Sequence, residues 1–343
     1  MSRLADEKFM RLALHEAARG IGRTSPNPAV GAVIVKAGRV VAKGWHRCAG
    51  APHAEIEALR SPKNPGLARG ATLYVTLEPC CTHGRTPPCT DAIVNAGLAR
   101  VVAGATDPNP RHAGRGFAIL KKAGVRVTSG VLATECTAMN APFNKWITTG
   151  LPFVIAKAGM SLDGRFTRPS GEGQWLTSPH SRADAMRLRA YVDAILIGAE
   201  TLRADNPSLT IREIRGFQDK QPWRVVLTRS GPLPKSAHLF TDIHRARTLV
   251  YRKKPLRFVL RDLARRGCTS VMIEGGGELL GTAFDARLVD RVHFYFAPIL
   301  VGGPVVIGGR GARATNGSAQ LKNVKYLRVG PDLLLTADAE YRD

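Results

Sequence analysis

The chain has 343 residues, of which 44% are hydrophobic and 22% charged, and its formal net charge is +23. This length exceeds what one ordinary hydrophobic core serves, so the sequence predicts two domains. No apolar run approaches the roughly 20 residues of a membrane-spanning helix, no signal-peptide pattern opens the chain, and the scattered cysteines do not resemble a secreted disulfide framework. We therefore expect a globular cytoplasmic protein.

The first half alternates helical and strand-like patterns. A helical pattern at residues 4–19 precedes two apolar runs, 32–35 and 40–44, which a glycine turn joins as a hairpin. This order predicts an α/β/α sandwich for residues 1–145. The remaining predicted elements of this domain are a helix that opens at His53, a strand at 71–77, a helix at 90–98, a strand at 101–105, a helix at 115–123 and a strand at 125–127.

Asn, Pro and Gly residues interrupt the pattern between residues 140 and 152 and predict the domain boundary there. The second domain, residues 150–343, is predicted to contain a mostly parallel sheet of the doubly wound kind. Its predicted strands are 153–158, 193–197, 224–228, 248–251, 270–274 and 292–296, with helices at 179–190 and 256–266.

His53, Cys80 and Cys89 are candidate zinc ligands, and Glu55 is a nearby carboxylate that is not a ligand. One imidazole and two thiolates leave a fourth tetrahedral position for water, whose pKa the metal lowers toward about 7. Hydrolytic deamination also needs a group that moves protons from this water to the ring nitrogen and the departing ammonia. Glu55 is the candidate for that role.

The known signature of zinc deaminases is H-x-E followed by P-C-x-x-C. The chain matches H-A-E at 53–55 and P-C at 79–80, but eight residues separate Cys80 from Cys89. Cys81 is an alternative second ligand; Cys80 is preferred because it directly follows Glu-Pro.

The segment between Cys80 and Cys89 reads C-T-H-G-R-T-P-P at 81–88. It contains a hydrogen-bond donor, a cation and rigid turn residues, which suggests a loop that holds the substrate. Together with T-S-P-N-P-A-V-G at 24–31 and D-P-N-P at 107–110, it resembles the bifunctional riboflavin-biosynthesis deaminase/reductase family. Cys81 and Thr82 stand where that family usually has Ser and His. The resemblance implies that residues 1–145 form a cytidine-deaminase-like α/β/α sandwich. It also implies that Asn27, His83 and Arg85 contact the deaminase substrate.

In the second half, a glycine run at 275–277 follows a predicted strand and precedes a helix. Such a turn lets backbone N–H groups approach a pyrophosphate, although a plain tight turn is an equal alternative. K-A-G-M-S-L-D-G at 157–164, G-Q-W-L-T at 173–177 and D-N-P-S-L-T-I-R at 205–212 resemble the reductase half of the same family, whose fold is similar to dihydrofolate reductase.

The resemblance implies two sets of contacts in the reductase half. Arginines suit a phosphate because they bind it in a bidentate way, and a carboxylate suits sugar hydroxyls. Gly159, Gly173 and Thr228-Arg229 depart from the usual Ala, Ser and Asp-Ser. The expected NADPH contacts are Gly159, Trp175, Thr201, Asp205, Gly276, Gly277, Glu278, Leu279, Leu280, Gly281 and Thr282, and the expected substrate contacts are Lys157, Gly173, Arg189, Leu209, Arg212 and Glu274.

The zinc motif predicts Zn²⁺ as a cofactor, and the resemblance implies NADPH as a second cofactor and a pyrimidine ribose-phosphate as substrate. The enzyme would deaminate 2,5-diamino-6-ribosylamino-4(3H)-pyrimidinone 5′-phosphate and then reduce the ribosyl unit to ribityl. Its positive charge is spread over both halves, as in a general surface property, and we expect neither a membrane nor a nucleic-acid partner. Homo-oligomerisation is possible. The alternatives are a nucleic-acid deaminase, a deaminase whose reductase half is inactive, and a zinc-stabilised binding protein.

Overall fold

The computed structural model describes residues 2–61, 65–83, 87–166 and 175–341. It divides into two compact units, residues 1–150 and 151–343, each with its own sheet and hydrophobic core. Among the described residues, no helix is both long and apolar enough to cross a bilayer.

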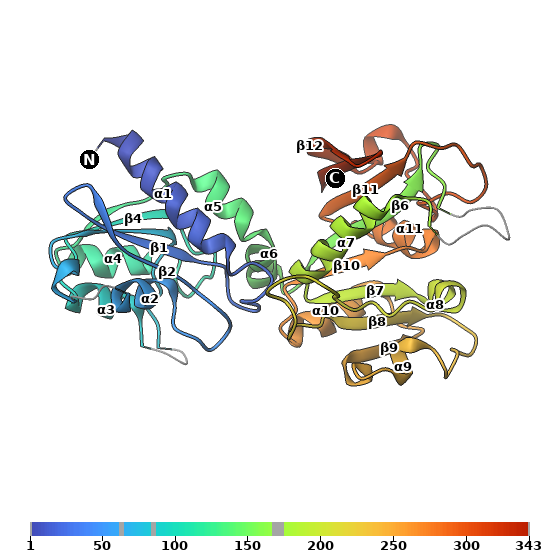
Figure 1. The fold of residues 1–343 in the computed structure, drawn as a ribbon, viewed down its shortest axis with the longest axis horizontal. Helices are drawn as coiled ribbons and strands as arrows, with labels where there is room; N and C mark the ends of the chain where they lie inside the picture. The colour runs from blue at the N-terminus through green and yellow to red at the C-terminus, as the bar shows by residue number, and fades with distance from the viewer. Residues whose placement is uncertain (1, 62–64, 84–86, 167–174, 342–343) are drawn as a thin grey trace. The chain divides into compact units, whose positions relative to one another are not determined.

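The first unit is a five-stranded sheet with helices on both faces, as predicted. The strand order is β2-β1-β3-β4-β5; β1 runs antiparallel to β2 and β3, and the other neighbours are parallel. Helices α1 and α5 cover one face, and α2, α3 and α4 the other (Figure 1). The elements are α1 (Arg3–Ala18), β1 (Gly31–Lys36), β2 (Arg39–Trp45), α2 (Ala54–Arg60), the 3₁₀ turn η1 (Pro65–Ala68), β3 (Thr72–Leu77), α3 (Cys89–Asn95), β4 (Arg100–Ala105), α4 (Arg115–Lys122), β5 (Arg126–Thr128), α5 (Ala133–Met139) and α6 (Ala141–Thr149).

Glycine allows the helices of this unit to lie directly on the sheet. A Cβ atom at Gly44 of β2 would stand 2.3 Å from the backbone nitrogen of Ala58 in α2, and one at Gly31 of β1 would stand 2.1 Å from the carbonyl oxygen of Ala13 in α1. Such distances are far below van der Waals contact, so both positions require glycine. Gly44 therefore fixes the height of α2, the helix that carries Glu55.

The predicted interruption at 140–152 is different in the structure, because α6 occupies most of it and ends at Thr149, with Gly150 as a left-handed C-cap. Proline lies in the first turn of α6, where its missing N–H costs no helical hydrogen bond. The Asn140 side chain accepts from the Ala29 N–H at 2.8 Å and donates to the Ala29 carbonyl at 2.9 Å. Asn140 therefore anchors the 24–31 segment instead of breaking the chain into a linker.

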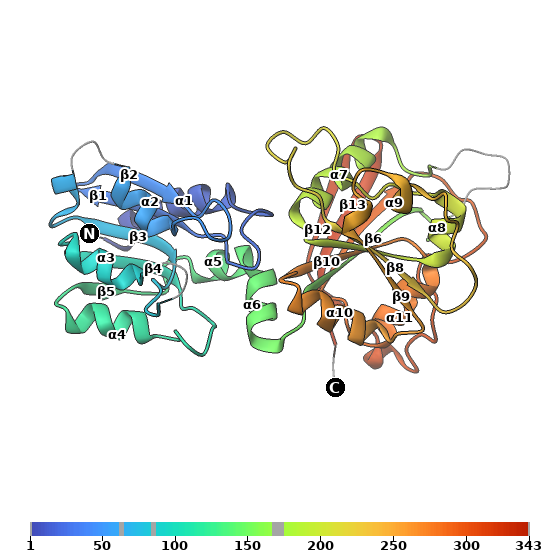
Figure 2. The same ribbon diagram turned by 90° about the horizontal axis from the view of Figure 1, so that it is seen from below.

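The second unit is an eight-stranded, mostly parallel sheet in the order β12-β13-β11-β6-β10-β7-β8-β9. Helix α7 packs on one face, and α10 and α11 on the other (Figure 2). The sequence did not predict β12 and β13, the antiparallel hairpin at one edge. The elements are β6 (Phe153–Ser161), α7 (Pro179–Tyr191), β7 (Ala194–Gly198), α8 (Ala199–Asp205), β8 (Trp223–Thr228), α9 (His238–Thr241), η2 (Arg245–Arg247), β9 (Thr248–Arg252), α10 (Leu256–Arg265), β10 (Ser270–Glu274), α11 (Gly277–Asp285), β11 (Arg291–Ala297), η3 (Thr315–Gly317), β12 (Gln320–Val329) and β13 (Asp332–Glu340).

Candidate active sites

The first unit brings the three predicted metal ligands together beyond the end of β3. His53 is the N-cap of α2, Cys89 is the first residue of α3, and Cys80 follows β3. The nitrogen and sulfur atoms of the three side chains lie within 4.8 Å of one another, and His53 Nδ1 is 3.3 Å from Cys89 Sγ and 3.4 Å from Cys80 Sγ. The N–S edge of a tetrahedral zinc site is about 3.6 Å, so this donor set fits Zn²⁺ with little adjustment.

Cys81 does not join this cluster. Its sulfur lies 3.6 Å from His112 Nδ1, and burial raises the pKa of its thiol. Hydrogen bonding from Cys89, together with His53, instead lowers the pKa of Cys80 to about 4. The cluster therefore contains Cys80, the cysteine preferred from the Glu-Pro-Cys motif, and not Cys81.

Glu55 lies in the first turn of α2 and is 3% exposed. Its carboxyl group is within hydrogen-bonding reach of the Cys89 sulfur. Burial, followed by the charge of Cys80, raises the pKa of Glu55 to about 7. A carboxyl group in this position can both accept and release a proton near neutral pH, which is what a proton carrier requires.

Glu78 has a role that the motif alone did not indicate. This buried carboxylate accepts backbone N–H hydrogen bonds from Asp107 at 3.1 Å, Gly114 at 2.9 Å and Gly116 at 2.9 Å. A Cβ atom at Gly116 would stand 2.3 Å from the Pro79 carbonyl oxygen. The Glu-Pro-Cys turn and the 107–116 loop therefore pack together, and this packing fixes the position of Cys80.

Of the predicted deaminase substrate residues, Asn27 is linked to the metal cluster by His46, which contacts both Asn27 and His53. The Asn27 amide nitrogen is 3.0 Å from His46 Nε2, and the His46 ring stands edge-on to His53 with centroids 5.3 Å apart. Since His46 Nδ1 is 3.0 Å from the Pro52 carbonyl, it carries the proton and Nε2 accepts from Asn27. His83 is exposed, and Arg85 lies outside the described residues. No sequence motif indicates this role of His46, although it lies only seven residues before the H-A-E motif.

The second unit contains a cavity of about 1400 Å³ along the carboxyl ends of its parallel strands. Single ligands occupy pockets of roughly 300–1,000 Å³, so this cavity has room for a dinucleotide and a substrate together. The predicted residues that line it are Lys157, Gly159, Trp175, Arg189, Thr201, Asp205, Leu209, Glu274, Gly276, Gly277, Glu278, Leu279, Leu280 and Thr282.

Two predicted residues, Arg212 and Gly281, do not line the cavity. Arg212 is exposed, does not line the cavity and donates to Ser208 Oγ at 3.1 Å. Gly281 faces the backbone of Gly308, where an added Cβ would come within 2.2 Å, so its position reflects close packing of α11. Gly173 lies outside the described residues.

At the substrate end of the cavity, Arg189 of α7 binds Glu274 of β10 through two hydrogen bonds of 2.7 Å. Burial favours the neutral form of Glu274, but Arg189 and Lys157 outweigh it and lower the pKa of this carboxyl group to about 2. Burial lowers the pKa of Lys157. This lysine lies on β6, in register with Glu274 on the neighbouring strand β10. The two groups predicted to contact phosphate and sugar thus form one ion pair with a lysine beside it.

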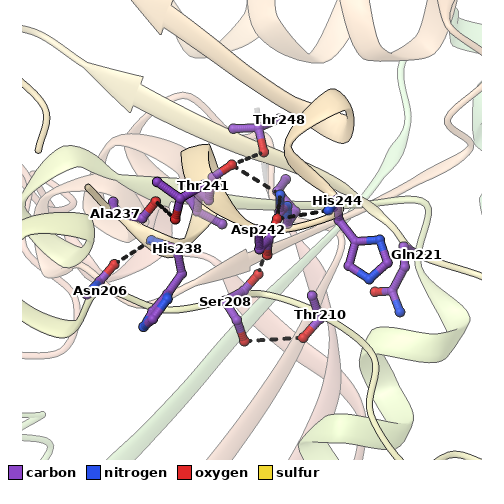
Figure 3. A network of polar contacts seen from close by, with 12 residues as sticks. Asn206, Ser208, Thr210, Gln221, Ala237, His238, Thr241, Asp242, His244 and Thr248 are labelled. Atoms are coloured by element: carbon purple, nitrogen blue, oxygen red, sulfur yellow. Dashed lines mark hydrogen bonds and ion pairs between the residues drawn. The ribbon is translucent and has the colours of Figure 1, made fainter. Parts of the chain in front are cut away.

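The segment that follows α8 is held against the sheet by a buried cation. Arg224 of β8 is 1% exposed; it donates to the Ser208 and Leu239 carbonyls, each at 3.1 Å, and pairs with Asp242. Figure 3 shows Asn206, Ser208 and Thr210 along this segment beside His238 and Asp242. Leu209, between them, has φ +50° and is buried in the cavity wall. No sequence pattern indicates this network, because Arg224 lies inside an otherwise apolar strand.

The cofactor end of the cavity fits a phosphate-bearing dinucleotide. Gly275 and Gly276 have φ of +71° and +77°, and a Cβ atom at Gly276 would stand 3.1 Å from Thr201 Oγ1. Helix α11 begins at Gly277, so its first N–H groups face the cavity. Glycine at this turn is therefore required by the fold.

The comparisons with known proteins agree in both halves. Residues 4–105 match the cytidine and deoxycytidylate deaminase zinc-binding region, and residues 152–335 match the RibD C-terminal domain. The chain is 40% identical to the riboflavin biosynthesis protein RibD of Bacillus amyloliquefaciens, over 97% of this chain and 96% of the relative. It is 39% identical to RibD of Escherichia coli (strain K12), over 97% of this chain and 99% of the relative.

Solved structures give the same result. Acinetobacter baumannii RibD, form 1, has a TM-score of 0.89 and 34% identity, covering 99% of this chain and 100% of that chain. The diaminohydroxyphosphoribosylaminopyrimidine deaminase/5-amino-6-(5-phosphoribosylamino)uracil reductase of Thermotoga maritima also has a TM-score of 0.89 and 34% identity, covering 98% and 99%. With these relatives covering almost its whole length, the chain belongs to the RibD family of riboflavin biosynthesis proteins.

Proposed function

We propose that the chain catalyses two consecutive steps of riboflavin biosynthesis, one in each unit. The first unit removes the 2-amino group of 2,5-diamino-6-ribosylamino-4(3H)-pyrimidinone 5′-phosphate. The second unit then reduces the ribosyl side chain to ribityl with NADPH. The observation that carries this proposal is the cluster of His53, Cys80 and Cys89 with a buried Glu55 beside it, in a chain that also has a large strand-end cavity.

In the deaminase unit, His53, Cys80 and Cys89 would hold zinc. Zinc, when bound, is the Lewis acid that makes water a nucleophile at neutral pH. Glu55 takes a proton from the attacking water and delivers protons to the ring nitrogen and to the departing ammonia. His46, in its Nδ1-protonated form, orients the Asn27 amide, which makes Asn27 a fixed contact for the pyrimidine. His83 and Arg85 remain proposed contacts for the substrate.

In the reductase unit, the glycine turn 275–277 and the start of α11, with Thr201, Asp205 and Trp175, would hold NADPH, which supplies the hydride when bound. Lys157 presents an ammonium group to the sugar oxygen from which the ring opens. Burial lowers the pKa of Lys157 and the Glu274 carboxylate opposes this lowering, while the Arg189–Glu274 ion pair provides polar atoms for the sugar and its phosphate.

We further propose that the protein is cytoplasmic and forms a homo-oligomer. All six cysteines are free thiols, and a thiolate metal site suits a reducing compartment. For oligomerisation, β12 is an edge strand whose apolar residues Tyr326 and Leu327 are 64% and 51% exposed. An exposed apolar edge of this kind is suited to pairing with a second copy. The nucleic-acid deaminase, the inactive reductase and the zinc-stabilised binding protein are not favoured.

The decisive experiment feeds the diamino-pyrimidinone phosphate to the purified protein and follows ammonia and NADPH absorbance separately. The Glu55→Gln variant is expected to keep its zinc and lose ammonia release by roughly 10²–10⁴-fold, since the amide cannot carry protons. It should still oxidise NADPH on substrate that is already deaminated.

Glu57→Gln is the matched control, because Glu57 lies on the same helix but pairs with Arg47. If Glu55→Gln released ammonia at the normal rate, the assignment of this residue would be wrong. If the unmodified protein released ammonia without oxidising NADPH, the reductase half of the proposal would fail.

A further inference from the structure

The substrate loop of the deaminase unit, residues 81–88, begins against a buried histidine that lies outside the zinc motif. His112 follows β4 and is 8% exposed. Its Nδ1 atom is 3.4 Å from the Cys81 backbone nitrogen, and its Nε2 atom is 3.4 Å from Thr82 Oγ1. One imidazole therefore contacts the first two residues of the loop, the same two that depart from the usual Ser and His of the family.

The backbone around His112 is tied to the Glu-Pro-Cys turn. The His112 N–H donates to the Asn109 carbonyl at 2.8 Å, and the Asn109 N–H donates to the Asp107 carboxylate at 2.8 Å. On either side of this turn, the N–H groups of Asp107 and Gly114 donate to Glu78. The His112 ring is therefore mounted on the same structure that leads the chain to its metal ligands.

The contacts of His112 determine which ring nitrogen carries the proton. A backbone N–H only donates, so Nδ1 accepts from Cys81 and Nε2 carries the proton. Nε2–H then donates to Thr82 Oγ1. A threonine hydroxyl has a single hydrogen, and while its oxygen accepts from His112 this hydrogen points away from the ring. His112 therefore makes the Thr82 hydroxyl a donor toward a third group.

Thr82 is placed where a substrate can receive this hydrogen bond. It is exposed, and its Cα lies at most about 7 Å from that of the metal ligand Cys80, because two residues of extended chain span no more. His83, the next residue, is a proposed substrate contact. A hydroxyl donor at this place suits an oxygen acceptor of the pyrimidine ribose-phosphate, either the ring carbonyl or a phosphate oxygen.

We propose that His112 is a positioning residue of the deaminase that acts through Thr82: it holds the start of the substrate loop and makes the Thr82 hydroxyl donate to an oxygen of the substrate. This inference rests on the proposed deaminase function. His112 is outside the metal cluster, so its contribution is to substrate binding and not to the proton transfer by Glu55. In this chain, an imidazole from the 107–116 loop supports the position at which the family usually has a histidine of the loop itself.

The test is ammonia release by the full-length, zinc-loaded protein, with KM and kcat measured separately. His112→Phe keeps a planar ring without its nitrogens, and Thr82→Val keeps the branched shape without the hydroxyl. Each should raise the KM for the diamino-pyrimidinone phosphate by roughly twofold to tenfold, the range of a neutral hydrogen bond, and leave kcat and the zinc content unchanged. His112→Gln, whose amide still donates to Thr82, should recover part of the loss, and so should Thr82→Ser.

The double variant His112→Phe/Thr82→Val distinguishes this role from general support of the fold. If His112 acts through Thr82, the double variant should have the KM of the single variants, whereas independent effects would multiply. The same assay with the dephosphorylated substrate identifies the acceptor. The effect of Thr82→Val should disappear there if the hydroxyl donates to the phosphate, and persist if it donates to the ring carbonyl.

His15→Phe is the matched control, because His15 is an exposed histidine of α1 in the same unit. An unchanged KM in Thr82→Val, or multiplied effects in the double variant, would overturn the inference and leave the deaminase function intact. Loss of zinc from both His112→Phe and His112→Gln would also overturn it, since His112 would then support the metal centre itself. Failure of the unmodified protein to release ammonia would instead overturn the deaminase function, and this inference with it.

Discussion

At the level of single residues, the metal centre depends on which of two adjacent cysteines is the ligand. Cys80 lies in the cluster with His53, and Cys81 turns toward His112. We expect Cys80→Ser to lose most of its zinc and Cys81→Ser to keep about one zinc per chain. Metal analysis of the purified variants measures this directly. Equal zinc loss in both would mean that the two thiols exchange roles.

Glu274 provides a prediction about pH. Its folded-state pKa of about 2 lies below the ordinary value of 4.5, because Arg189 and Lys157 outweigh the effect of burial. A depressed carboxyl pKa stabilises the fold above pH 4.5, and this stabilisation is lost as the pH falls toward 2. The melting temperature of the reductase unit should therefore fall over that range.

The Glu274→Gln variant tests this assignment. It should melt at a lower temperature at neutral pH, and its melting temperature should fall less steeply in acid. Glu278→Gln, which changes an exposed carboxylate of the same cavity, is the control and should follow the unmodified protein. Calorimetric scans at several pH values would contradict the assignment if Glu274→Gln and the unmodified protein lose stability in acid with the same slope.

At the level of elements, the 206–212 segment depends on the strand beneath it. Arg224→Met removes the cation that holds the Ser208 carbonyl and leaves Asp242 without its partner. Breaking a buried ion pair costs about 3–5 kcal/mol, and the lower end applies because Asp242 is a quarter exposed. The reductase unit should therefore melt earlier, and its KM for the sugar substrate should rise because Leu209 shifts.

Deaminase activity is the internal control for Arg224→Met, since the change lies wholly in the second unit. The Arg224→Lys variant should restore part of the substrate affinity, which a purely global loss of stability would not do. An unchanged KM in Arg224→Met, with stability lowered, would show that the network supports the fold without positioning the substrate segment.

Elements with a clear pattern were predictable, and the others were not. The apolar runs of β1, β3 and β4 lie in the core, so their residue types are dictated by burial and can be recognised in the sequence. Strand β12 is exposed along nearly its whole length, which leaves no alternation to detect. Helix α6 was obscured by Pro142 and the Thr-Thr-Gly run, which are compatible with a helix start and a helix end.

The candidate sites show the same division. His53, Cys80 and Cys89 could be identified because metal coordination fixes residue type and motif spacing. The roles of His46 and Arg224 depend on partners distant in sequence, respectively Asn27 and the Ser208 carbonyl, and no local pattern records such pairs. Arg212 was assigned from the family motif alone, and the structure places its side chain on Ser208 instead of in the cavity wall.

At the level of the whole molecule, the exposed edge strand β12 carries the proposed self-association. If β12 pairs with a second copy, the Tyr326→Lys variant should shift the protein toward monomers, because a charge replaces an apolar contact at the edge strand. Sedimentation velocity over a range of protein concentrations measures this. Ile243→Lys, at a residue 87% exposed outside β12, should leave the distribution unchanged. A monomeric unmodified protein would refute the proposed oligomer.

In both units some of the groups proposed to meet a ligand lie on connectors that follow strands: Cys80 beyond β3, and the glycine turn beyond β10. The sheets support these connectors, and only the ends of their strands line the proposed sites. Substitutions in these connectors could therefore change ligand specificity in either unit while the sheets keep their fold.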